Sequence, residues 1–93
     1  MQQLSIDDFT PWLNEACDMA FDGGQVPMTL VKAEPLEGGV RGAGAFRLEF
    51  LGPASPVLAQ ATMAVRRADF DHEIFIVPIA SDAAGTHYEA VFY

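Results

Sequence analysis

The chain has 93 residues, of which 51% are hydrophobic and 19% charged, and its formal net charge is −8. A chain of this length builds one core, so residues 1–93 are expected to form a single domain, and the composition is too apolar for a disordered chain. The excess of acidic residues repels phosphates, which excludes nucleic acid from the expected partners.

The first predicted element is a short helix. Ser5 suits the N-cap position, and Asp8 places a carboxylate in the first turn. Pro11 is tolerated only in the first turn of a helix, because its ring clashes with the preceding turn. The sequence therefore predicts about two turns, from Ile6 to Leu13, with Trp12 on the apolar face.

A β-hairpin is expected next. Apolar and polar residues alternate from Cys17 to Phe21, which is the period of a half-buried strand. Asp22-Gly23-Gly24 supplies residues that tolerate positive φ in a tight turn, and Val26 to Ala33 then forms the second strand. Pro27 has no N–H group, so the start of this strand is expected at a sheet edge or a bulge.

The middle of the chain predicts a loop and two further strands. The glycine-rich run from Glu34 to Gly44 has no apolar period and is expected to be a loop. Alternation of apolar and polar residues resumes from Phe46 to Phe50, which predicts a third strand. It resumes again from Ala61 to Arg66, and in this fourth strand the odd-numbered residues are expected to point inward. Asp69-Phe70-Asp71 is expected to turn the chain.

Two C-terminal strands, His72 to Ala80 and Thr86 to Tyr93, are joined by the expected loop Ser81 to Gly85. If Ser81 lies opposite Gly85, both faces of the hairpin are apolar, which a sheet with one face in water does not explain. This register pairs Ile79 with His87, Val77 with Glu89, Phe75 with Val91 and Glu73 with Tyr93, and places Ile74, Ile76, Pro78, Tyr88, Ala90 and Phe92 on the other face.

The predicted fold is mainly β: a short N-terminal helix followed by about six antiparallel strands that form a small barrel or sandwich. The second apolar face of the hairpin needs a cover. The N-terminal helix with Trp12, closure of the sheet, and a second copy of the chain are the three alternatives.

No catalytic or cofactor site is expected. His72 and His87 fall near opposite ends of the last strand pair, on the order of 20 Å apart, so they cannot share a metal ion. Cys17 occupies the apolar phase of its strand and is expected to be a small buried hydrophobic residue. No serine lies in a nucleophile elbow. The sequence thus predicts a protein that is not an enzyme and has no cofactor.

One acidic cluster leaves a cation site open. Asp69, Asp71 and Glu73 occur at alternate positions, so their oxygens can converge as the ligands of a hard cation do. The cluster lacks the glycine and the distant glutamate of a calcium loop. Ion pairing with Arg66 and Arg67 across the same hairpin is the favoured interpretation.

The sequence also predicts the compartment. No apolar stretch approaches the roughly 20 residues of a membrane-spanning helix. No basic residue precedes Lys32, so no signal peptide is expected. Cys17 is the only cysteine, which favours a reducing compartment. We expect a cytoplasmic protein.

Five short segments, spread over nearly the whole chain, carry a family resemblance. They are Asp8-Phe9-Thr10-Pro11, Met28-Thr29-Leu30-Val31, Phe50-Leu51-Gly52-Pro53, Ile74-Phe75-Ile76-Val77-Pro78-Ile79 and Tyr88-Glu89-Ala90-Val91-Phe92. In these the chain resembles a family of short uncharacterised bacterial proteins, a domain of unknown function often encoded beside phage-tail-collar-domain proteins. The chain departs from the family pattern at Tyr93, where Asn is usual. The resemblance implies a β-rich accessory protein without known catalytic residues.

These observations favour a non-enzymatic structural or protein-interaction domain, an accessory protein of a phage-tail-like or surface-fibre locus. Its expected partner is a protein or a second copy of the chain, as in a homodimer. The amphipathic aromatic residues Trp12, Tyr88 and Tyr93 are candidates for exposed anchors. The predicted interaction surface consists of Trp12, Phe75, Val77, Ile79, Val91 and Tyr93. An acidic inhibitor or immunity-type protein that binds a basic target is the alternative, and a small metal-dependent hydrolase ranks below it.

Overall fold

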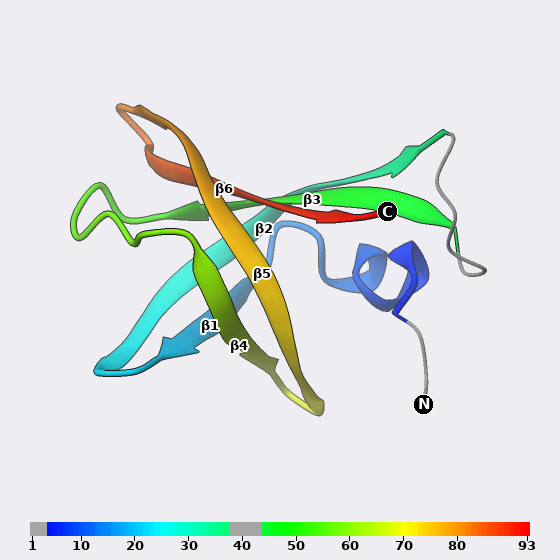
Figure 1. Ribbon diagram of the computed structural model, residues 1–93, viewed down its shortest axis with the longest axis horizontal. Helices are drawn as coiled ribbons and strands as arrows, with labels where there is room; N and C mark the ends of the chain where they lie inside the picture. Colours follow the sequence, from blue (N-terminus) through cyan, green and yellow to red (C-terminus); the bar gives the residue numbers. More distant parts are fainter. Residues whose placement is uncertain (1–3, 38–43) are drawn as a thin grey trace.

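The computed structural model describes residues 4–37 and 44–93, and the fold is mainly β as predicted (Figure 1). Six antiparallel strands form one ring-like sheet with the order β1-β2-β3-β6-β5-β4, in which β1 also pairs with β4. The elements are the 3-10 helices η1 (Ile6–Asp8) and η2 (Thr10–Trp12) and the strands β1 (Ala16–Phe21), β2 (Gly24–Leu36), β3 (Ala45–Gly52), β4 (Ala61–Arg67), β5 (Phe70–Asp82) and β6 (Gly85–Phe92).

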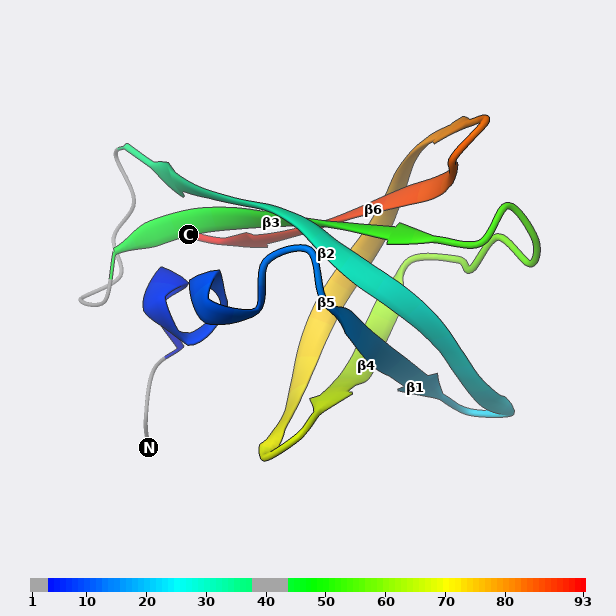
Figure 2. The same cartoon turned by 180° about the vertical axis from the view of Figure 1, so that it is seen from behind.

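The ring is closed by few contacts. β1 and β4 pair only where Asp18, Met19 and Ala20 face Arg66, Val65 and Ala64, and the two strands diverge on either side (Figure 2). The long strand β5 changes its neighbour: its first part pairs with β4 up to Ile76, and from Val77 onward it pairs with β6. β5 and β6 therefore splay apart before Val77, over the first part of β5 (Figure 1).

The N-terminal helical segment packs against the splayed strands. Phe9 is fully buried, with its ring centroid 5.7 Å from that of Phe46, 5.2 Å from that of Phe70 and 5.9 Å from that of Phe92. Trp12 adds a further contact, 5.6 Å from Phe70. These rings join the core formed by the inward residues of the strands, including Ile74, Ile76, Tyr88 and Ala90. Ring closure and the helical segment together cover the inner face of the C-terminal hairpin.

The helical segment consists of two 3-10 turns instead of the single two-turn helix expected over Ile6–Leu13. Pro11 cannot continue the first turn, and it lies in the first turn of η2 instead. Ser5 is the N-cap residue as predicted, and its N–H donates to Asp8 Oδ2 at 2.8 Å, which is the reciprocal hydrogen bond of a capping box. Among the described residues, no helix has the length and apolar character needed to span a membrane.

The loop expected over Glu34–Gly44 begins later than predicted. β2 continues to Leu36, because Glu34, Pro35 and Leu36 pair with β3. Residues 38–43 of the predicted loop lie outside the described residues. Pairing with β3 begins only at Thr29, so Pro27 lies where β2 has β1 as its strand neighbour, in agreement with the predicted edge position.

Two turns are shorter in the structure than the sequence predicts. Asp82 lies opposite Gly85, so Ala83 and Ala84 alone form the last turn, and Asp82 Oδ1 accepts the N–H of Ala84 at 2.8 Å. The expected turn over Asp69–Asp71 is equally tight, because β5 already begins at Phe70.

The register of the last hairpin also differs. Val77 opposes Glu89 as predicted, but a bulge between Pro78 and Ala80 leaves Ala80, instead of Ile79, opposite His87. Phe75 does not pair with Val91, because at that point β5 has already changed its neighbour and Phe75 faces Thr62.

Gly85 is required by a close approach between strands. Its φ is +142°, and a Cβ atom here would lie 2.1 Å from the Gly52 carbonyl oxygen. We predict that Gly85→Ala lowers the free energy of unfolding by about 3 kcal/mol or more, because both the backbone conformation and the contact become unfavourable. Gly23→Ala is the matched control: φ there is +102° but nothing lies within 4 Å, so only about 1 to 2 kcal/mol should be lost. Equal losses in urea unfolding would contradict the role of the contact.

Candidate functional site

A line of large hydrophobic side chains runs along the outer side of β5. Phe75 is 53% exposed and Ile79 is 45% exposed, with the partly buried Val77 between them. Val91 and Tyr93, at the end of the chain, are 50% and 58% exposed. We call Phe75, Val77, Ile79, Val91 and Tyr93 the outer stripe. The structure thus leaves five of the six residues of the predicted surface at least partly exposed.

Trp12 does not belong to this surface. It is 4% exposed, its indole N–H donates to the Asp8 carbonyl at 2.8 Å, and the Arg67 guanidinium lies 5.6 Å from its ring centroid. Tyr88 is fully buried, and its hydroxyl accepts the Leu58 N–H at 2.9 Å. Of the three aromatic residues considered as exposed anchors, only Tyr93 lies at the surface, because the closed ring needs the other two rings in its interior.

A network of charged residues crosses the outer side of β2, β3 and β6. Arg47, on β3, donates to Glu34 at 2.5 Å, to Glu49 at 3.1 Å and to Glu89 at 2.7 Å. Burial lowers the pKa of Arg47, but the three carboxylates outweigh burial and raise its pKa overall. Arg47 remains charged and holds three strands together on this side of the ring.

His87 extends the network to β5. Its Nδ1 lies 2.9 Å from Glu49 Oε2 and its Nε2 lies 2.8 Å from Asp82 Oδ2. Hydrogen bonding to Asp82, followed by that to Glu49, raises the pKa of His87 against the opposing effect of burial. Only the doubly protonated ring can donate to both carboxylates, which is why the folded state favours the imidazolium. We call Glu34, Arg47, Glu49, Asp82, His87 and Glu89 the charged ridge.

Sequence reasoning missed this ridge. The sequence places His87 near one end of the last strand pair and gives it no partner, because its partner Glu49 lies on β3, far away in the chain. The sequence did contain one signal. Arg47 and Glu49 occupy alternate positions of one strand, His87 and Glu89 occupy alternate positions of another, and the residues between them are hydrophobic. Without the strand order, this alternation indicated only solvent-facing positions.

The other candidate groups do not assemble into a reactive site. His72 lies on the part of β5 that pairs with β4, opposite Val65, whereas His87 lies between β3 and β5. Cys17 is buried, and burial, followed by the nearby Asp18 carboxylate, raises the pKa of its thiol to about 12. The thiolate is therefore disfavoured, in agreement with the expected role of Cys17 as a small hydrophobic residue.

One acidic residue after β4, Asp71, forms an ion pair. Asp71 opposes Arg66, and the two charged groups are 3.5 Å apart, as predicted. Arg67 contacts Glu15 instead of the acidic cluster. Within residues 4–37 and 44–93, no group of three or more His, Cys, Asp or Glu side chains is arranged to hold a metal ion.

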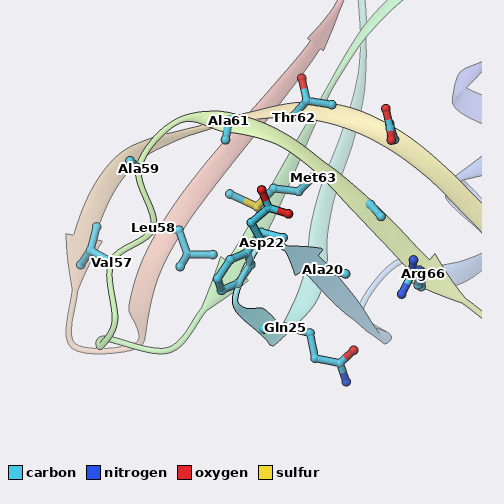
Figure 3. A pocket seen from close by; sticks show the side chains of 14 residues that line it. Ala20, Asp22, Gln25, Val57, Leu58, Ala59, Ala61, Thr62, Met63 and Arg66 are labelled. Atoms are coloured by element: carbon cyan, nitrogen blue, oxygen red, sulfur yellow. The ribbon is translucent and has the colours of Figure 1, made fainter.

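An open groove of about 900 Å³ lies where β1 and β4 diverge (Figure 3). Leu58 and Met63 contribute apolar side chains to it, and the β1–β2 turn contributes Asp22. Thr62 and Glu73 also line it. The groove thus interrupts the ring of strands. Leu58 and Met63 form its apolar floor, and Asp22 and Glu73 form its acidic border. No sequence pattern indicated it, because it arises from the angle between two strands.

Comparison with known proteins supports the resemblance to a domain of unknown function. Residues 4–92 match the model of a domain of unknown function, DUF6916. The chain belongs to this family. No curated protein and no solved structure matches the chain.

The geometry of His87 predicts a pH-dependent stability. Because the pKa of His87 is raised in the folded state, its stabilising contribution is complete below about pH 6.5, the ordinary histidine value, and is lost as the pH rises through the folded-state pKa. We expect His87→Gln to remove this loss from a plot of melting temperature against pH. His72→Gln is the matched control and should keep the wild-type profile. If His87→Gln leaves the profile unchanged, the two carboxylates do not favour the imidazolium.

Proposed function

We propose that this domain is a non-enzymatic protein-interaction module that self-associates as a homodimer through the outer stripe. The observation that supports it is the exposure of Phe75, Ile79, Val91 and Tyr93 on the outer side of a sheet whose interior is already filled. Exposed large apolar side chains commonly mark an interface.

The face of the sheet, and not its edge, is the contact that we propose. Beyond Ile76, β5 no longer pairs with β4, so the edge of its last part is free of a strand neighbour among the described residues. Pro78 has no N–H group, and the bulge at Ile79 disturbs the regular spacing of the backbone groups on this edge. Both features block the addition of a strand. The apolar side chains on the face remain available.

The charged ridge makes this side suitable for a second copy of the same acidic chain. Here the carboxylates of Glu34, Glu49 and Glu89 are paired with Arg47. Arg47 offsets part of the negative charge of these carboxylates, so two copies that meet on this side repel each other less than unpaired carboxylates would. A symmetric dimer also places the same apolar patch on both partners.

The biological setting of the module is part of the proposal. The family resemblance supports an accessory protein of a phage-tail-like or surface-fibre locus. An acidic inhibitor needs free carboxylates, and those of the charged ridge are already paired with Arg47 and His87, which makes that alternative weaker.

The double variant Phe75→Ser and Ile79→Ser tests the proposal. Both side chains are about half exposed, and burying the remainder contributes roughly 1 kcal/mol each, so four side chains in a dimer contribute about 4 kcal/mol. The dissociation constant should rise about 1000-fold. Sedimentation equilibrium over a range of concentrations measures it, and the melting temperature reports whether the variant folds.

Val57→Ser is the matched control. Val57 is 57% exposed, but it lies in the connection between β3 and β4 and not on the outer stripe. It should leave the dissociation constant unchanged. A wild-type chain that stays monomeric at all concentrations, or equal weakening by Val57→Ser, would overturn the proposed dimer.

A further inference from the structure

We propose that the groove between β1 and β4 binds an extended peptide segment of a partner protein, in which apolar and basic residues alternate. This inference is independent of the proposed homodimer, because the groove and the outer stripe differ in residues and in chemistry. Three observations carry it: the interrupted pairing of β4, the apolar floor and the acidic border.

The interrupted pairing specifies an extended backbone. β1 pairs with β4 only over Ala64–Arg66, so within the described chain no strand lies beside Ala61, Thr62 and Met63 on this side. β5 pairs with the same three residues on their other side and keeps them extended. Alternate residues of an extended strand direct their N–H and C=O groups into the groove, and a peptide strand can satisfy them.

The floor specifies apolar side chains at every second position. Phe21 and Leu58 are partly buried and Met63 is 3% exposed, and all three line the groove. A peptide that extends the sheet at β4 points alternate side chains inward, toward this floor. The small residues Ala20 and Ala64, which pair across β1 and β4, also line the groove.

The border specifies basic side chains at the positions between. Asp22 and Glu73 are exposed and line the groove, whereas the nearby Arg66 is paired with Asp71 at 3.5 Å. The outward side chains of a bound strand meet these carboxylates. Lysine or arginine complements them, and an acidic residue is repelled. The net charge of −8 attracts the same kind of peptide over a longer range.

The probe is a fluorescein-labelled synthetic peptide, Thr-Val-Lys-Val-Lys-Val-Thr, with blocked ends. We expect saturable binding in fluorescence anisotropy, and slower hydrogen exchange of amides in residues 61–63 when the peptide is present. The peptide with glutamate in place of lysine should bind at least about tenfold more weakly, because it faces Asp22 and Glu73 with like charge. A peptide methylated on alternate amide nitrogens should also lose about tenfold, because it cannot donate to β4.

Matched variants locate the site. Asp22→Asn with Glu73→Gln should weaken binding about 3- to 10-fold at low salt, as expected for two exposed ion pairs. Asp7→Asn with Glu37→Gln changes the net charge equally, away from the groove, and should leave affinity close to wild type. All four side chains are exposed, so neither variant is expected to unfold the chain.

Some results would overturn the proposal. They are the absence of saturable binding, equal affinity for the glutamate peptide, equal weakening by the two double variants, and exchange protection at residues 75–79 instead of 61–63. Repeating the titration with the Phe75→Ser, Ile79→Ser chain keeps the test separate from self-association. If the wild type is monomeric, the proposed homodimer is wrong but peptide binding in the groove can still be observed. If the peptide does not bind, the proposed homodimer is unaffected.

Discussion

The change of neighbour along β5 is the constraint on which the rest of the structure depends. β5 pairs with β4 up to Ile76 and with β6 from Val77. It therefore connects β4 to β6 and completes the ring on this side. The same change splays β5 from β6 and uncovers the inner face of both. Phe9 and Trp12 bury that face, which is why a chain with so little helix still needs its N-terminal segment.

The register of the remaining strands is supported by charges as well as by the core. Arg47 contacts carboxylates on β2, β3 and β6, so a shift of one residue between these strands would turn its partners to the other face. An exposed pair such as Arg66–Asp71 contributes only about 0 to 1 kcal/mol. Arg47 is better placed, because its side chain is 19% exposed and its partners come from three strands. The charged ridge therefore specifies register.

The sequence predicted the local features of this fold well. Alternation at Cys17–Phe21, Phe46–Phe50 and Ala61–Arg66 identified strands, because each strand has one face in the core. Strand order could not be predicted in this way, since the pairs β1–β4 and β3–β6 join residues far apart in the chain. The burial of Trp12 and the contacts of His87 both follow from that order. The outer stripe was largely predictable, because it needs only the alternation within β5 and β6.

The two proposed surfaces meet on β5. Glu73 borders the groove, and Phe75, two residues further along the same outer side, begins the outer stripe and lies opposite the groove residue Thr62. A strand bound beside β4 would therefore lie one strand away from the proposed dimer face on β5. If the peptide strengthens or weakens self-association by some factor, self-association must change the affinity for the peptide by the same factor. Because Thr62 faces Phe75 across β4 and β5, this strand pair is the route through which any coupling between the two proposed surfaces would pass.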